Sequence, residues 1–167
     1  MKAILCQRFG TPDDLVLADV PEPVAGPGEV VAKVAAVGLN FFDTLIIAGK
    51  YQTKPPFPFS PGGEFAGVVE SVGAGVTEFQ PGDRVMGYTN FNAARERTAV
   101  AADQIVKISA DLDFERAAAL DHHLRHRLSR ARSTGPGCVP ARRWPCSAPR
   151  AGSGSPRSSW AGSWVRA

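Results

Sequence analysis

Short runs of β-branched and other apolar residues recur along the first 120 residues, and most of them end at glycine or proline. Valine and isoleucine favour strands, whereas glycine supplies positive φ in turns and proline presets its own φ. Short runs at this spacing, without the long helices of a βαβ fold, indicate a β-barrel or sandwich. Two short helices are predicted, over 42–47 and from Asp113 onward. The expected strands are 1–8, 15–20, 30–37, 64–72, 84–88, 98–102 and 105–108.

The composition of the chain changes abruptly after residue 120. Residues 1–120 contain 10 lysines and arginines against 15 aspartates and glutamates, a net charge of −5. Residues 121–167 contain nine arginines and one acid, a net charge of +8, with all three histidines and all three tryptophans. We expect a folded domain over 1–120 and a disordered, basic Arg/Ser/Gly/Pro-rich tail over 121–167. Such a tail buries too little apolar surface to offset the entropy lost on ordering.

The whole-chain features exclude several classes of protein. There is no run of 18 apolar residues that could span a membrane. Lys2 and Arg8 interrupt the N-terminal segment before an apolar stretch of secretory-signal length can form. The three cysteines are too few and too scattered for a disulfide framework. We therefore expect a cytoplasmic protein without a membrane partner.

Gly73-Ala74-Gly75 is a glycine-rich stretch that could be taken for a phosphate-binding loop. Such loops bind phosphate because they lead into the N-terminus of a helix. The residues that follow, 76–79, have no helical pattern. The sequence therefore predicts a turn here rather than a dinucleotide site.

Three segments carry a family resemblance. They are Val-Gly-Leu-Asn-Phe-Phe-Asp at 37–43, Pro-Gly-Gly-Glu-Phe-Ala-Gly-Val-Val at 61–69, and Val-Gly at 72–73 leading to Pro-Gly-Asp-Arg-Val at 81–85. In this order they resemble the GroES-like catalytic domain of the medium-chain dehydrogenase/reductase superfamily. The resemblance covers residues 1 to about 120. It implies a mainly β, GroES-like barrel with short helices, and residues 121–167 do not continue into the Rossmann domain of that superfamily.

The zinc ligands of the zinc-dependent branch have no counterpart here. Those relatives place a cysteine after the strand that ends near Val37 and a histidine just before the motif glutamate, Glu64. In this chain 38–43 holds no cysteine, Gly63 precedes Glu64, and residues 1–120 contain no histidine. Catalytic zinc needs three protein ligands of Cys, His or carboxylate type. We expect no metal site, and a structural role for Glu64 between strands.

Asn40-Phe41-Phe42-Asp43, followed by Gly49-Lys50-Tyr51, resembles the Asn-x-x-Asp and Gly-x-Tyr segments of zinc-independent NADPH:quinone oxidoreductases, the zeta-crystallin-like family. The resemblance implies hydride transfer from NADPH to a quinone or enone, with the protein supplying position and polar contacts. It implies three catalytic residues: Asn40, Tyr51 and Asp43. Members of this family are often homodimers.

The resemblance also implies a role for each of these residues. Asn40 would orient the nicotinamide or the substrate carbonyl, and is therefore also the expected cofactor-binding residue. Tyr51 would line the quinone pocket, and Asp43 would hold the local backbone. The alternatives are a turn role for Asn40 and a packing role for Tyr51. Leu45 departs from the many relatives that carry a cofactor-contacting tyrosine at its position.

The tail allows three interpretations. Its histidines, with Cys138 and Cys146, could bind a metal, or its arginines and tryptophans could bind single-stranded nucleic acid. The interpretation we favour is GC-rich DNA translated out of frame, because arginine, proline, serine and glycine abound while lysine, isoleucine and phenylalanine are missing. Shifting the frame by two nucleotides makes 146–160 compatible with the Ala-x-x-Gly-x-x-Gly dinucleotide fingerprint of the family. A one-nucleotide shift of 121–125 permits the helix that the family has there.

The sequence thus predicts the N-terminal half of a quinone oxidoreductase, truncated or frame-shifted at its C-terminus and inactive as this chain. Two alternatives remain open at this point. One is a GroES-like interaction module without catalysis. The other is a related zinc-free enoyl reductase or alcohol-dehydrogenase-like protein. Nucleic-acid binding is not expected despite the basic tail.

Overall fold

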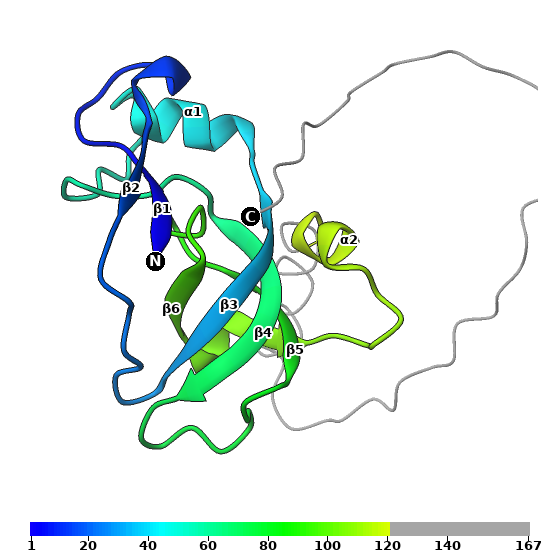
Figure 1. Cartoon of the computed structure of the whole chain (residues 1–167). Helices are drawn as coiled ribbons and strands as arrows, with labels where there is room; N and C mark the ends of the chain where they lie inside the picture. Colours follow the sequence, from blue (N-terminus) through cyan, green and yellow to red (C-terminus); the bar gives the residue numbers. More distant parts are fainter. Residues whose placement is uncertain (121–167) are drawn as a thin grey trace, which may run out of the picture.

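The computed structural model describes residues 1–120, which form a mainly β domain (Figure 1). The expectations about residues 121–167, including the tail and its boundary, lie outside the described residues. The described strands are β1 (Lys2–Leu5), β2 (Val16–Asp19), β3 (Glu29–Gly38), β4 (Glu64–Val72), β5 (Arg84–Tyr88), β6 (Arg97–Ala101) and β7 (Ile105–Lys107). The described helices are α1 (Phe41–Ile47) and α2 (Phe114–Ala118), with the single 3-10 turns η1 (Pro12–Asp14) and η2 (Ala102–Gln104).

Two long strands, β3 and β4, form the centre of a five-stranded antiparallel sheet in the order β6-β3-β4-β5-β7. Their pairing runs from Val30 opposite Val72 to Gly38 opposite Glu64, and it slips at two points along the way. Such irregularities increase the local twist and bend a strand pair, and β3 and β4 curve visibly in Figure 1. The sheet therefore brings the end of β3 beside the beginning of β4.

The antiparallel pair β1–β2 lies beside this sheet and is joined to it by main-chain contacts. Ala3 forms an isolated bridge with Arg95, and Cys6 forms one with Phe59. These contacts explain why the first predicted strand, over 1–8, ends early. After Leu5 the chain leaves β2 and pairs instead with the loop that precedes β4.

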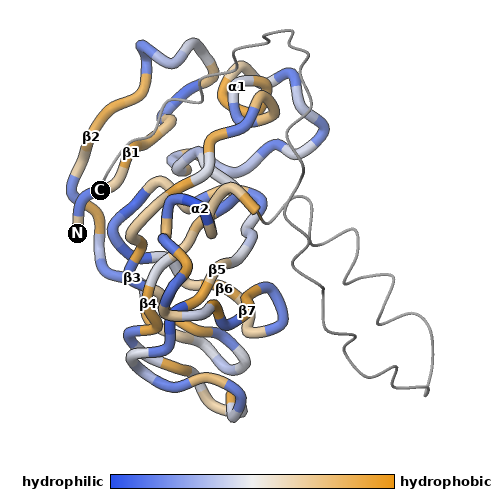
Figure 2. Tube along the Cα trace, turned by 90° about the vertical axis from the view of Figure 1, so that its right-hand side faces the viewer, coloured by the Kyte–Doolittle hydropathy of each residue, from blue (hydrophilic) through white to orange (hydrophobic). Residues whose placement is uncertain are grey.

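The core lies between the curved strands and the segments that cover them. Figure 2 shows both apolar (orange) and polar (blue) stretches along the chain of the sheet. Consecutive residues are buried at 30–32 in β3 and at 64–67 in β4, so both faces of the sheet are covered there. Small side chains let α2 pack closely on the other side of the sheet. The main cluster contains Val30, Ala32, Val34, Phe65, Val69, Phe79, Val85, Ala93, Val100 and Ile105. Under α2 lie Ala36, Ala66, Met86, Ala117 and Ala118.

The remaining fold predictions agree with the described residues to within a few positions. The turn predicted at Gly73-Ala74-Gly75 is confirmed, with the main-chain N–H of Val76 donating to the carbonyl oxygen of Gly73 at 3.3 Å. The N–H of Gly28 also donates to the carbonyl oxygen of Ala74 at 2.8 Å. A Cβ on Gly73 would lie 1.8 Å from the carbonyl oxygen of Gly26, so glycine is needed there for close backbone approach. Within residues 1–120, no helix has the length and apolar character to cross a membrane.

Candidate functional site

Asn40 stands at the junction between β3 and α1. Its backbone is extended, with φ −119° and ψ 165°, and the helix begins at the next residue. The main-chain N–H of Asn40 donates to Oδ2 of Asp43 at 2.8 Å, and its carbonyl oxygen accepts from the N–H of Asp43 at 3.0 Å. The carboxylate thereby satisfies a main-chain donor at the start of the helix, which is one half of a capping box.

Asp43 also holds a distant loop. Its Oδ1 accepts a hydrogen bond of 3.0 Å from the main-chain N–H of Gly62. Asp43 is only 5% exposed, so this bond lies in the interior. Burial raises the pKa of Asp43, the two N–H donors of Asn40 and Gly62 lower it, and the nearby charge of Glu64 raises it. The carboxylate therefore joins the start of α1, where a backbone role was expected, to the loop before β4.

Glu64 is the second buried carboxylate of this cluster, with 2% of its surface exposed. Its Oε2 accepts a hydrogen bond of 2.9 Å from the side-chain Nδ2 of Asn40. Its Oε1 is buried and has no hydrogen-bond partner within residues 1–120. A Cβ on Gly38 would lie 2.9 Å from Oε2 and 2.8 Å from the carbonyl oxygen of Ala118. The absence of a side chain at Gly38 thus makes room for this carboxylate between β3 and α2.

Tyr51 does not join this polar cluster. Its ring lies 5.9 Å from that of Phe42, centroid to centroid, with the planes inclined by 34°. It packs against the buried cluster formed by Cys6, Ile46, Ile47 and Phe59. The structure therefore brings two of the three predicted catalytic residues together, Asn40 and Asp43. Tyr51 is connected to them through the ring of Phe42, which lies on the same helix as Asp43.

The position before Glu64 has no space for a side chain. A Cβ on Gly63 would lie 2.9 Å from Cζ of Phe42 and 2.9 Å from the carbonyl oxygen of Thr89. The ring of Phe42 and the backbone after β5 thus occupy the space that a histidine would need. In the part of the chain that the structure describes, no group of three or more His, Cys, Asp or Glu side chains is placed to hold a metal ion.

Two contributors to this cluster were not identified from the sequence. Gly62 donates the N–H that Asp43 accepts, and it adopts a φ of +88°, a conformation that favours glycine. Gly38 gives Glu64 its space. The Pro-Gly-Gly sequence before Glu64 signals a special backbone, but the partner of that backbone lies on another element. Only the folded arrangement reveals the contact.

The fold and this cluster define a GroES-like domain of the dehydrogenase type. Residues 26–110 match the family described as alcohol dehydrogenase GroES-like domain, and the chain belongs to that family. The chain is 40% identical over 122 residues to the quinone oxidoreductase of Lama guanicoe. The matched segment covers 72% of this chain and 37% of the relative. The predicted GroES-like fold and the resemblance to quinone oxidoreductases are therefore confirmed.

Solved structures give the same result. The quinone oxidoreductase of Pseudomonas syringae pv. tomato DC3000 matches with a TM-score of 0.70 and 36% identity, over 81% of this chain and 43% of that one. The Escherichia coli quinone oxidoreductase complexed with NADPH matches with a TM-score of 0.66 and 31% identity, over 71% of this chain and 36% of that one. The chain spans little more than a third of the length of the llama relative. Residues 1–120 contain the GroES-like domain and no Rossmann domain.

Proposed function

We propose that residues 1–120 are the catalytic-domain half of a zinc-independent, NADPH-dependent quinone oxidoreductase, which transfers a hydride from NADPH to a quinone or enone. The observation that carries this proposal is the contact between Asn40 and the buried Glu64, within a domain whose relatives are quinone oxidoreductases. Functional groups are most effective when a supporting layer of contacts fixes their rotamers. The amide of Asn40 is fixed in this way.

The described residues could bind the nicotinamide end of a dinucleotide but not its pyrophosphate. They contain no glycine-rich loop that leads into a helix, so they offer no pyrophosphate site of the Rossmann kind. They do offer a polar residue, Asn40, between the exposed apolar side chains of Leu39 and Phe41. That arrangement fits the nicotinamide end of NADPH, which when bound would supply the hydride. Asn40 would orient the carboxamide or the substrate carbonyl.

Tyr51 and Phe42 would form an aromatic wall for a flat quinone, since their ring centroids lie 5.9 Å apart and their planes are inclined by 34°. Asp43 would act as a positioning residue, because its two main-chain hydrogen bonds hold the start of α1 against the loop at Gly62. None of these roles needs a metal ion. The crowding at Gly63 supports a zinc-independent reaction, because a histidine there would collide with Phe42 and the backbone.

We also propose that the 167-residue chain by itself oxidises NADPH negligibly. Positioning of two reactants supplies much of the rate enhancement of such enzymes, and it requires that the cofactor be held firmly. Incubating the purified chain with NADPH and 1,4-benzoquinone, and following the loss of NADPH absorbance, tests this directly. Turnover at the level of a complete quinone oxidoreductase would refute it.

A chimera tests the function of the domain itself. Residues 1–120 would replace the matching half of the Escherichia coli quinone oxidoreductase, and NADPH-dependent reduction of 1,4-benzoquinone would be measured. We expect activity in the chimera and a fall in kcat of about tenfold to hundredfold in Asn40→Ala. Asn90→Ala, an exposed amide outside the cluster, is the matched control and should leave kcat unchanged. A folded, NADPH-binding chimera without quinone reduction would contradict the proposal.

A further inference from the structure

Strand β2 has a free edge at the outside of the domain. It pairs with β1 on one side, and within residues 1–120 no strand pairs with its other side. Figure 2 shows β2 at the margin of the domain, with an apolar stretch along it. Val16 and Leu17, on opposite faces of this strand, are 38% and 71% exposed. A free edge with exposed apolar side chains is a template for pairing with another strand.

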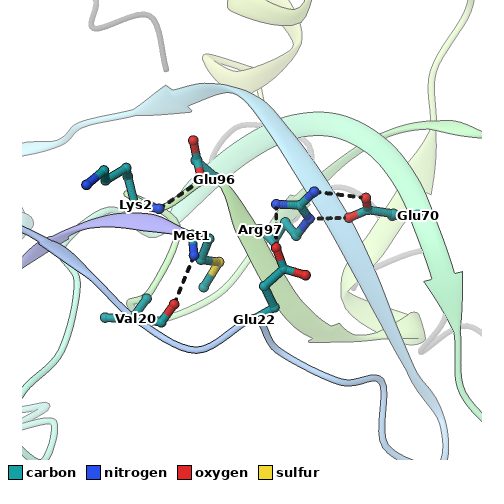
Figure 3. Close-up of polar contacts among 7 residues, drawn as sticks. All are labelled: Met1, Lys2, Val20, Glu22, Glu70, Glu96 and Arg97. Atoms are coloured by element: carbon teal, nitrogen blue, oxygen red, sulfur yellow. Dashed lines mark hydrogen bonds and ion pairs between the residues drawn. The ribbon is translucent and has the colours of Figure 1, made fainter.

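The hydrogen bonds of β1 determine which main-chain groups of β2 point outward. The terminal amine of Met1 donates to the carbonyl oxygen of Val20 at 3.0 Å (Figure 3). The main-chain N–H of Val20 donates in return to the carbonyl oxygen of Met1 at 2.9 Å. Hydrogen-bonded and non-bonded residue pairs alternate along an antiparallel ladder. The pair Ile4–Leu17, three positions further along β1, is therefore a non-bonded pair.

The main-chain N–H of Ile4 agrees with this alternation. It points away from β2 and donates to the carbonyl oxygen of Ala94 at 2.9 Å. Leu17 lies opposite Ile4, so its own N–H and carbonyl groups point away from β1, toward the free edge. The same alternation directs the main-chain groups of Asp19, two residues further on, to that edge. The edge thus offers donors and acceptors at every second residue.

The two edge strands of the five-stranded sheet are protected in ways that β2 is not. β6 begins at Arg97, which forms ion pairs of 3.2 and 2.6 Å with Glu22 and Glu70 (Figure 3). β7 is three residues long and ends at Lys107. Charged side chains and short length are devices that prevent pairing at a sheet edge. β2 carries one charged residue, Asp19, at its end, and is otherwise apolar.

The edge of β2 is complementary to itself. In an antiparallel pair of two copies, the outward groups of Leu17 would meet those of either Leu17 or Asp19 of the second copy. The first register creates an aliphatic row across four strands, in the order Ile4, Leu17, Leu17, Ile4, and sets Val16 opposite Ala18 on the other face. Apolar pairs opposite one another stabilise a sheet. The second register would interrupt the row with a carboxylate opposite each leucine.

The surroundings of this row suit an interface. The exposed ion pair of Lys2 and Asp19, 2.6 Å long, would flank the row on one side, and the same pair of the second copy would flank it on the other. An apolar centre with a polar rim is typical of protein interfaces. Ile4 and Leu17 also line an aliphatic cavity of about 500 Å³. Leu17 of a second copy would therefore meet apolar surface beyond its partner leucine.

We propose that the chain associates with a second copy of itself through β2, about a two-fold axis that passes between the two Leu17 residues. The β1–β2 pairs of both copies then form one four-stranded antiparallel sheet. A closed two-fold contact uses the same surface on both copies. A contact of one short strand is small, so the dimer forms reversibly. The contact lies apart from the cluster around Asn40, and it does not depend on the proposed oxidoreductase activity.

Sedimentation velocity of the full chain from about 1 to about 100 μM tests this, because a small interface associates weakly. We expect the sedimentation coefficient to rise reversibly from that of a monomer to that of a dimer. Leu17→Lys would set two like charges opposite each other and should raise the dissociation constant about tenfold or more. Leu17→Glu should do the same. An equimolar mixture of the two variants should associate again, because lysine then faces glutamate.

Val24→Lys is the matched control, since Val24 is an apolar residue outside β2 and is 86% exposed. It should leave the dissociation constant unchanged. Association of the Lys and Glu variants with each other also shows that both are folded. A chain that stays monomeric at about 100 μM would overturn the proposal. A dimer that persists in Leu17→Lys, or a mixture that fails to associate, would likewise show that the two Leu17 residues do not face each other.

Discussion

The side-chain amide of Asn40 donates a 2.9 Å hydrogen bond to the buried carboxylate of Glu64, 24 residues further along the chain. The contact is possible because Gly38 at the end of β3 pairs with Glu64 at the start of β4. Asn40 follows that pairing by two residues. The central strand pair of the sheet therefore determines where the amide of the candidate site lies.

Glu64→Ala should lower the free energy of unfolding by about 1–3 kcal/mol, because it removes the buried acceptor of Asn40. Glu64→Gln retains an acceptor oxygen and removes a buried charge, so its effect should be smaller. Urea denaturation of both variants measures the difference. Glu78→Ala, at an exposed position, should be neutral. An equal loss in the Gln and Ala variants would contradict the role assigned to the hydrogen bond.

The pKa of Asp43 should respond to the charge at residue 64. Burial raises this pKa and the charge of Glu64 raises it further, against the lowering by two main-chain donors. Glu64→Gln should therefore lower the pKa of Asp43, as measured by ¹³C NMR of the carboxyl carbon. Glu78→Gln should leave it unchanged.

The same shift has a consequence for stability. Because the folded pKa of Asp43 lies above its ordinary value of 3.8, ionisation opposes folding. The contribution of Asp43 to the free energy of unfolding is complete below pH 3.8 and declines as the pH rises through the folded pKa. That decline should be smaller in Glu64→Gln when urea denaturation is repeated across this pH range. A steeper decline would show that Glu64 does not raise the pKa of Asp43.

The sequence located the central strands well and the polar contacts poorly. Pro61-Gly62-Gly63 precedes β4, Gly73 follows it, and Pro81-Gly82 comes just before β5. The predicted bounds of 64–72 and 84–88 agree with the structure. The environment of Arg95 was not predicted, because Ser60 lies 35 residues away in sequence and approaches it only in the fold. Periodicity reports which face of a strand is buried. It does not report which loops meet beyond the end of that strand.

Two glycines of one turn should respond differently to alanine. A Cβ on Gly73 would meet the carbonyl oxygen of Gly26 at 1.8 Å, and a backbone atom cannot move aside as a flexible side chain can. Gly73→Ala should therefore cost about 3 kcal/mol or more. Gly75 has a φ of +83° and nothing within 4 Å of its Cβ position. Gly75→Ala should cost about 1–2 kcal/mol, from backbone conformation alone. Denaturant titration of both variants measures this order, and the reverse order would contradict the close approach.

Asp14 should titrate at unusually low pH. The guanidinium of Arg8 donates to its carboxylate at 2.8 Å, and this bond, with those from Thr11, lowers the pKa of Asp14 from 3.8 to about 2. The stabilising contribution of Asp14 is therefore present above pH 3.8 and is lost as the pH falls toward about 2. Arg8→Gln should raise the pKa of Asp14 in a ¹³C NMR titration, whereas Arg116→Gln should not. An unchanged value in Arg8→Gln would show that Thr11 alone lowers it.

The composition of residues 121–167 yields a prediction about nucleotides rather than side chains. We propose that this segment is translated out of frame. The same DNA, read in a frame shifted by two nucleotides, would encode a dinucleotide-binding loop. That reading gives Gly-Ala-Ala-Gly-Gly only if the codons of residues 147–151, which encode Ser-Ala-Pro-Arg-Ala, all end in G. The glycines of such a loop allow close approach of the backbone to a pyrophosphate. Sequencing the coding DNA decides the matter, and A, T or C at the third position of these codons would remove the hidden fingerprint.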